Sequence, residues 1–262
     1  MASSPESGAG GPMPDADPLP EALELIEAGR AGGVPLRLMG GLAVRLLCPD
    51  FPPRARKGQD LDLASVSRTR PRLSELLVSR GYEPDKRFNA LYGHKQLYFR
   101  SPEGRTVDVI VDRLEMCHDL PFTDRIERMP LTLDLIDLLL SKLQIVELNE
   151  KDARDVVYLL AAYPVREGDE PGTIGLLRMQ AIVGEDWGWW RTLTHNLDRV
   201  RHFAVEAGAG FVPARASYDP VAQLDLLAEG AERAPKSLRW KMRARVGERK
   251  RWYRVPQEDT HD

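Results

Sequence analysis

Hydrophobic and polar positions are spaced with clear periods along the first half of the chain. After residue 20 a helical pattern runs to the breaker AGG, and further helical spacing occurs in LAVRLL and RPRLSELLVSRG. Strand-like runs occur in VPLRLM, QDLDLASV, KQLYFRS and RTVDVIVD. The last two runs are joined by the turn signal PEG. The pattern predicts a mixed arrangement of helices and strands.

The second half of the chain shows helical spacing with no strand alternation. From Pro130 the pattern predicts two helices that separate near 148–151 and end at Pro164, followed by more helices. We therefore expect an α+β fold, in which a small mixed sheet with flanking helices precedes an all-helical C-terminal region. The expected divisions are a disordered Gly/Pro/Ser-rich leader, a sheet-containing core, the helical region and a basic aromatic tail, at 1–18, 19–128, 129–235 and 236–262.

Composition narrows the class of protein. With 262 residues and 42% hydrophobic content the chain can bury a sizeable core, and its net charge of −3 gives no overall attraction for nucleic acid. Cys48 and Cys117 are too few for a disulfide framework, which fits a reducing cytoplasm. The sequence lacks a bilayer-spanning apolar run and a secretory signal. We expect a soluble cytoplasmic protein without a membrane partner.

The carboxylates of QDLDLASV stand inside a strand pattern. Because residues i and i+2 of a strand share a face, Asp60 and Asp62 point the same way while Leu61 and Leu63 face the core. Two unit charges about 5 Å apart repel by roughly 3 kcal/mol at an effective dielectric near 20. The pair therefore needs a metal, a basic neighbour or a shared proton.

A third carboxylate, Asp108, stands in the strand RTVDVIVD. Its neighbours Val107 and Val109 take one face and Asp108 the other, so adjacent strands would close a ring of three carboxylates. Asp112 shares the face but lies beyond the ring, where we expect a surface or supporting group. Hard oxygen ligands suit Mg²⁺ or Mn²⁺ together with substrate phosphates. The pattern favours metal-assisted phosphoryl or nucleotidyl transfer.

Gly40 and Gly41 add to this hypothesis. Backbone without side chains can approach phosphates closely, and the helix that follows offers unpaired N–H groups at its start. A pair of glycines alone most often marks a turn. Its combination with DLD and then VDV is the more specific signal.

The order GGLAV, basic loop, DLDL, VDVI resembles the nucleotidyltransferase fold of the DNA polymerase beta type, and more closely the bacterial AbiEii-type or minimal nucleotidyltransferases. The resemblance spans about 35–163. It implies an NTP donor at Gly40, Gly41 and the basic Arg56, and catalytic, metal-binding carboxylates at Asp60, Asp62 and Asp108. Downstream, the family's Lys and its R/K-D-x-x-D segment match Lys142, Lys151, Asp152 and Asp155.

The same resemblance implies an acceptor such as tRNA or another RNA, a protein side chain or, less readily, an aminoglycoside-like molecule. It also implies a toxin role with an antitoxin partner. Leu42 and Gly58 stand where the family often has Ser or Thr, so two hydroxyls that could touch phosphate are missing. The metal-binding set is intact.

Several alternatives stay open. Lys142 could reach a nucleotide phosphate or extend its amine to water, and Lys151 with Asp155 could be a simple pair within one helix. For His94 we expect a structural or solvent role. The tail at 236–254 has nine Lys or Arg against one Glu, so it is either a solvated segment with docked aromatic rings or a contact for nucleic acid or an acidic partner.

Two rival functions accompany the enzyme hypothesis. The fold could sense nucleotides or bind a partner without catalysis, or the tail could bind nucleic acid while the acidic residues are structural. Metal dependence discriminates between these functions. The enzyme and the nucleotide sensor both need the carboxylates for NTP binding, whereas nucleic-acid binding by the tail does not need them and is sensitive to salt.

Overall fold

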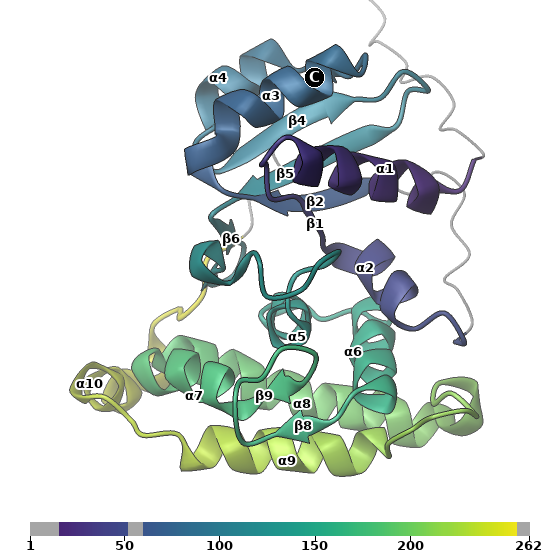
Figure 1. Cartoon of the computed structure of the whole chain (residues 1–262). Helices are drawn as coiled ribbons and strands as arrows, with labels where there is room; N and C mark the ends of the chain where they lie inside the picture. Colours follow the sequence, from purple (N-terminus) through teal and green to yellow (C-terminus); the bar gives the residue numbers. More distant parts are fainter. Residues whose placement is uncertain (1–15, 52–59, 256–262) are drawn as a thin grey trace, which may run out of the picture.

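Figure 1 shows the computed structural model, which describes residues 16–51 and 60–255. The expected α+β class is confirmed: a small mixed sheet with flanking helices is followed by a helical C-terminal region. Most of the predicted leader lies outside the described residues. So does the basic loop with Arg56 and Gly58.

The sheet places the two acidic strands side by side. Its order is β1-β2-β5-β4-β3, with β2 parallel to β5 and the other neighbours antiparallel. The strand bounds are Arg37–Leu38 for β1, Leu61–Ser65 for β2, Glu83–Pro84 for β3, Gln96–Arg100 for β4 and Thr106–Val111 for β5. A shared site requires the strands that carry Asp62 and Asp108 to be neighbours, and in the sheet they are.

Alternation along the strands decides which side chains enter the core. Val107, Val109 and Val111 are buried, and the residues between them are half-buried. Helices α1 (Pro18–Ala31) and α3 (Arg70–Ser79) contribute Leu25 and Leu73 to the same core. Helix α4 (Lys86–Tyr92) contacts β4 and was not predicted from the sequence. The acidic face of β2 and β5 is thereby left on the other side.

The C-terminal region is built from α5 to α10, with bounds Leu135–Leu143, Glu150–Ala162, Leu176–Glu185, Trp187–Ala207, Pro220–Arg233 and Leu238–Val246. Side chains of Asp134, Asn149 and Asp186 cap the first turns of α5, α6 and α8. The expected all-helical region also holds two-residue strands, β8 (Val165–Arg166) and β9 (Ile174–Gly175), which pair in parallel. Such short strands lack a readable alternation.

The two halves meet through α2 (Gly40–Leu47) and α6. The rings of Phe51 and Tyr158 lie 5.1 Å apart, and the Tyr163 hydroxyl donates to the carbonyl of Leu47 at 2.9 Å. A short hairpin of β6 (Arg113–Glu115) and β7 (Asp119–Pro121) leads from the sheet to α5. Within the described ranges, every helix is too short or too polar to cross a membrane.

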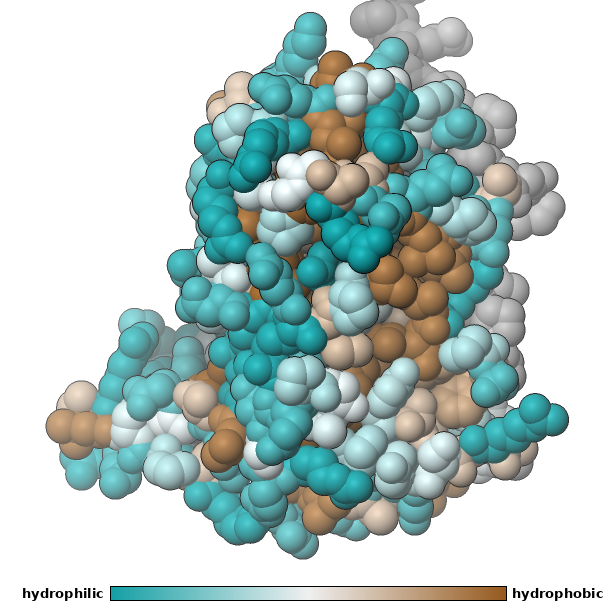
Figure 2. All heavy atoms as spheres, in the orientation of Figure 1, coloured by the Kyte–Doolittle hydropathy of each residue, from teal (hydrophilic) through white to brown (hydrophobic). Residues whose placement is uncertain are grey.

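Helix α10 lies at the edge of the helical half. Figure 2 shows apolar atoms at its position, where Leu238 and Met242 are 73% and 55% exposed. Its contact with the body comes from Trp240, whose ring lies 5.4 Å from that of Trp190, and from Arg243, which lies 4.8 Å above the ring of Trp187. The docked aromatic rings that one of the two alternatives for the tail expects are present in this part, and the contact with a partner stays a prediction.

Candidate active site

Asp62 and Asp108 lie opposite one another on neighbouring strands. They are register partners in the parallel pair β2 and β5. Adjacent strands are about 4.8 Å apart, so the two carboxylates share one face at close range. Both side chains are half-buried. The residues of DLD and VDV thus meet as the strand pattern predicts.

Gly40 lies against the Asp62 carboxylate. Its φ of +65° is a conformation that residues with a side chain rarely adopt, and a Cβ built there would overlap Asp62 Oδ2 and lie 3.1 Å from Cγ. The Met39 N–H donates to the carbonyl of Asp62 at 3.0 Å, which fixes the start of α2 beside β2. Gly41 follows in the first turn. The helix start, with N–H groups that lack intrahelical partners, therefore adjoins the carboxylates.

Asp60 stands directly before β2 and is exposed. Among the described residues, no group of three or more His, Cys, Asp or Glu side chains is arranged to hold a metal ion. The structure thus brings Asp62 and Asp108 together, and the three-carboxylate metal site with Asp60 stays a prediction.

Gln96 is a site residue that the sequence analysis missed. Its Nε2 donates to Asp108 Oδ1 at 2.8 Å from the neighbouring strand β4. The turn signal PEG predicts that the strands on either side form a hairpin, and counting outward from it would have placed Gln96 close to Asp108. A neutral amide thus orients one carboxylate of the pair.

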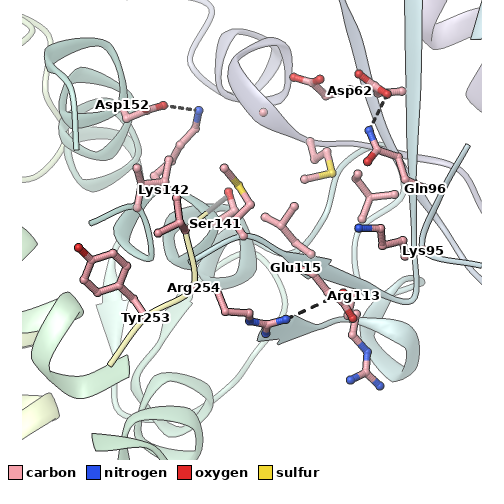
Figure 3. Close-up of a pocket in the computed structure, with 18 of the residues that line it drawn as sticks. Asp62, Lys95, Gln96, Arg113, Glu115, Ser141, Lys142, Asp152, Tyr253 and Arg254 are labelled. Carbon is pink, nitrogen blue, oxygen red and sulfur yellow. Dashed lines mark hydrogen bonds and ion pairs between the residues drawn. The ribbon is translucent and has the colours of Figure 1, made fainter. Parts of the chain in front are cut away.

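An 830 Å³ cleft opens in front of this pair. Its walls come from β4, β5 and β6 on one side and from α5, α6 and residues 251–255 on the other (Figure 3). Lysine and arginine side chains surround it, among them Lys95, Arg113 and Arg251. The cleft therefore combines two adjacent carboxylates with a rim of mixed charge, in which Glu115 and Asp152 stand among the basic side chains.

Lys142 lines the cleft with its amine between two carboxylates. Its Nζ lies 2.7 Å from Asp152 Oδ1 and 3.1 Å from Asp155 Oδ2, and its side chain is 12% exposed. The alternative of an amine extended to water is wrong, because a buried ammonium is stabilised here by partners on α6. Asp155 pairs with α5 rather than serving only an intrahelical pair with Lys151, which is exposed. Whether Lys142 binds a nucleotide stays a prediction.

Asp112 and His94 lie outside the carboxylate pair. Asp112 has φ 64°, and its Oδ1 accepts from the Ser67 N–H at 3.0 Å and the Thr123 hydroxyl at 3.2 Å. Burial alone would raise the pKa of Asp112, but these hydrogen bonds lower it below the usual value. His94 lines a separate hollow with Arg70 and Lys86. The hydrogen bonds of Asp112 fix a turn, which agrees with the expectation of a supporting group outside the carboxylate ring.

No family model matches the chain, and neither does any curated protein. Among solved structures, an antigenic nucleotidyltransferase-like protein from Paracoccidioides brasiliensis is 16% identical, with 81% of this chain and 99% of that one covered and a TM-score of 0.43. The antibiotic-resistance factor ANT(2'')-Ia is 12% identical, with 86% of this chain and 91% of that one covered and a TM-score of 0.30. A tRNA-processing enzyme is 11% identical, with 78% of this chain and 60% of that one covered and a TM-score of 0.28. These distant likenesses do not fix the activity of this chain.

Proposed function

We propose that the protein is a nucleotidyltransferase that moves a nucleoside monophosphate from an NTP to a hydroxyl or phosphate of an acceptor. The observation that carries this proposal is the register pairing of Asp62 with Asp108 beside the glycine start of α2. Adjacent carboxylates favour a bound cation, and a helix start without side chains favours a phosphate. A metal-bound triphosphate meets both conditions.

The donor atoms fit a divalent cation. Asp62 and Asp108 supply carboxylate oxygens, Asp60 stands directly before the strand of Asp62, and the missing Cβ of Gly40 leaves room around Asp62. Oxygen ligands of this kind select Mg²⁺ or Mn²⁺. When bound, such an ion neutralises the charge on the phosphates.

The chain's own residues would perform the remaining tasks. The N–H groups at Gly40 and Gly41 would bind the triphosphate, together with Lys142 from the cleft wall and with Arg56, which lies outside the described residues. The acceptor oxygen loses its proton to Asp108 and bonds to the α-phosphorus, while the bond from that phosphorus to the bridging oxygen breaks and pyrophosphate leaves. Gln96 holds one oxygen of Asp108 in position for this step.

A second candidate is nucleotide binding without turnover. It was motivated by the missing hydroxyls at Leu42 and Gly58. Leu42 is 1% exposed and belongs to the core, so a side chain at this position would not face a nucleotide. The missing hydroxyl at position 42 is therefore a weak argument against turnover. The acceptor, the toxin role and an antitoxin stay predictions of the family resemblance.

The first test is thermal stability with each NTP, with and without Mg²⁺. A ligand at 100 times its dissociation constant stabilises the folded state by about 2.7 kcal/mol. We expect a Mg²⁺-dependent shift for the wild type and for Asp198→Asn, an exposed carboxylate on α8. We expect none for Asp62→Asn or Asp108→Asn. A shift of equal size in all four proteins would place the nucleotide elsewhere.

Turnover then separates the two candidates. Release of pyrophosphate with an RNA or protein acceptor, lost in Asp108→Asn, supports transfer. Nucleotide binding that depends on Asp62, without pyrophosphate release for any acceptor, would support the second candidate, a nucleotide sensor without catalysis.

A further inference from the structure

The C-terminal strap, residues 251–255, leaves the helical half and lies against the β6–β7 hairpin (Figure 1). The Arg254 N–H donates to the carbonyl of Cys117 at 3.0 Å. The Arg254 guanidinium pairs with Asp119 and lies 4.0 Å from Glu115. These contacts attach the strap to the half of the molecule that carries the carboxylate pair.

Trp252 attaches the strap to α8. Its indole N–H donates to Thr192 Oγ1 at 3.0 Å, and its ring lies edge-on to Trp187 at 6.1 Å. Thr192 is also hydrogen-bonded to Nε2 of the buried His118 at 2.8 Å. Gly188 makes the close approach possible, since a Cβ there would meet the Trp252 carbonyl. The strap is therefore a packed element with a defined place.

The anchored residues present their neighbours to the cleft. Arg251 and Tyr253 line the same cleft as Asp62, Asp108, Lys95 and Arg113. Tyr253 packs edge-on to Trp252 at 5.4 Å, and the Arg251 guanidinium lies 5.8 Å from the Tyr253 ring. Figure 3 shows Tyr253 and Arg254 on the side of the cleft opposite Asp62. A basic and aromatic wall thus faces the carboxylates.

The basic side chains that line the cleft differ in whether they form ion pairs within the protein. Lys142 and Arg254 are paired with carboxylates. Lys95, Arg113 and Arg251 form no ion pair in the part of the chain that the structure describes, and Lys95 only approaches the Tyr92 ring at 5.2 Å. Three such cations and the Tyr253 ring line one cleft, which suits a chain of phosphates with stackable bases.

We propose that the strap is the acceptor wall of the cleft and that the acceptor is a single-stranded nucleic acid. Its phosphates contact Lys95, Arg113 and Arg251, and a base stacks on Tyr253. This inference rests on the proposed nucleotidyl transfer and names its substrate class. It also unites two features that the sequence presented as rivals, because the basic tail and the acidic strands border one cleft.

The test is the binding of a fluorescently labelled single-stranded oligoribonucleotide to the full chain, without NTP, measured by anisotropy over a range of salt. We expect Arg251→Glu and Tyr253→Ala each to weaken binding about tenfold, and Arg113→Ala to reduce the salt slope by about 1. The matched control is Arg87→Glu, an exposed position on α4 outside the cleft wall, which should bind like the wild type.

Equal binding by Arg251→Glu and Arg87→Glu would overturn the inference. So would displacement of the oligonucleotide by polyglutamate at a matched concentration of charge, which would indicate an acidic protein partner instead. The NTP shifts are read in the same variants. If the NTP shift depends on Asp62 but RNA binding does not depend on Arg251, only the acceptor wall is refuted. If RNA binding depends on Arg251 but no NTP shifts the thermal stability, only the proposed transfer is refuted.

Discussion

Two groups of carboxylates in this protein differ in their burial and in where they lie in the fold. The acidic core cluster joins Asp134, Asp137 and Asp169 to three guanidinium groups, those of Arg125, Arg128 and Arg178. The Asp134 and Asp137 side chains are fully buried, and Arg125 alone reaches all three carboxylates at 2.6 to 2.7 Å. The cleft pair, Asp62 and Asp108, is half-buried beside the neutral Gln96 amide and a helix start.

The comparison teaches that the setting of a carboxylate indicates its role better than its presence does. In the acidic core cluster, internal cations make a buried network that fastens α5 to the segments before and after it. In the cleft pair, strand register puts two like charges together on the wall of an open cleft. The first arrangement serves stability, and the second can accept a cation from solution. Each of the following variants tests one side of that contrast.

The largest effect is expected for Arg125→Met. Removing this guanidinium leaves Asp134 with Arg128 alone and Asp137 with Arg178 alone, and breaking a buried ionic network costs about 3–5 kcal/mol. Burial already raises the pKa of Asp134, so the loss should shrink as pH falls and the carboxyls of the folded variant take up protons. Urea unfolding at several pH values measures both. Asp62→Asn, on the half-buried wall of the cleft, should cost much less stability, and a loss as large as that of Arg125→Met would erase the distinction.

Lys142→Met tests a position that belongs to both sides of the contrast. We expect a loss of about 2–3 kcal/mol, less than for Arg125, because water reaches Asp152, whose side chain is 13% exposed. If Lys142 also binds a phosphate, the NTP dissociation constant should rise about tenfold. Asp155→Asn weakens the pair but keeps the amine, so it should retain NTP affinity. Unchanged NTP affinity in Lys142→Met would make this lysine structural.

Gly40→Ala tests the close approach of α2 to the cleft pair. The positive φ costs about 1–2 kcal/mol with a side chain. Gly104→Ala carries the same strain at φ +86° with no atom near its Cβ, so it is a matched control. We expect Gly40→Ala to lose more stability than Gly104→Ala, because its Cβ also meets the Asp62 carboxylate, and only Gly40→Ala to lose the Mg²⁺-dependent NTP shift. A normal shift in Gly40→Ala would show that the Asp62 position is not critical.

The smallest change in stability is expected for Gln96→Met. Loss of one hydrogen bond costs about 1 kcal/mol, and Gln180→Met, which removes a half-buried bond to the Gly230 carbonyl, should cost the same. Only Gln96→Met should weaken Mg²⁺ binding, by about tenfold, since Gln96 orients Asp108. Titration of Mg²⁺ at fixed NTP concentration measures this. Equal Mg²⁺ affinity in the two variants would remove Gln96 from the site.

Strand alternation and glycine pairs predicted the part of the site that depends on local pattern. The period of two assigns Val107 and Asp108 to opposite faces, and the structure confirms it. The partners of Lys142 could not be predicted, because they depend on how α5 packs against α6. Helix α4 was missed because its seven residues are too few to show a period. The course of the strap was hidden because Trp252 and Thr192, 60 residues apart, meet only in the folded chain.

The late position of the strap in the chain has a consequence for biosynthesis. The sheet and its carboxylates are complete by Val111, and domains generally begin to fold in order of synthesis. The strap completes the cleft only after Arg251 to Val255 have left the ribosome and reached Cys117 and Thr192. A nascent chain would therefore fold the pair of Asp62 and Asp108 before the cleft in front of it is complete.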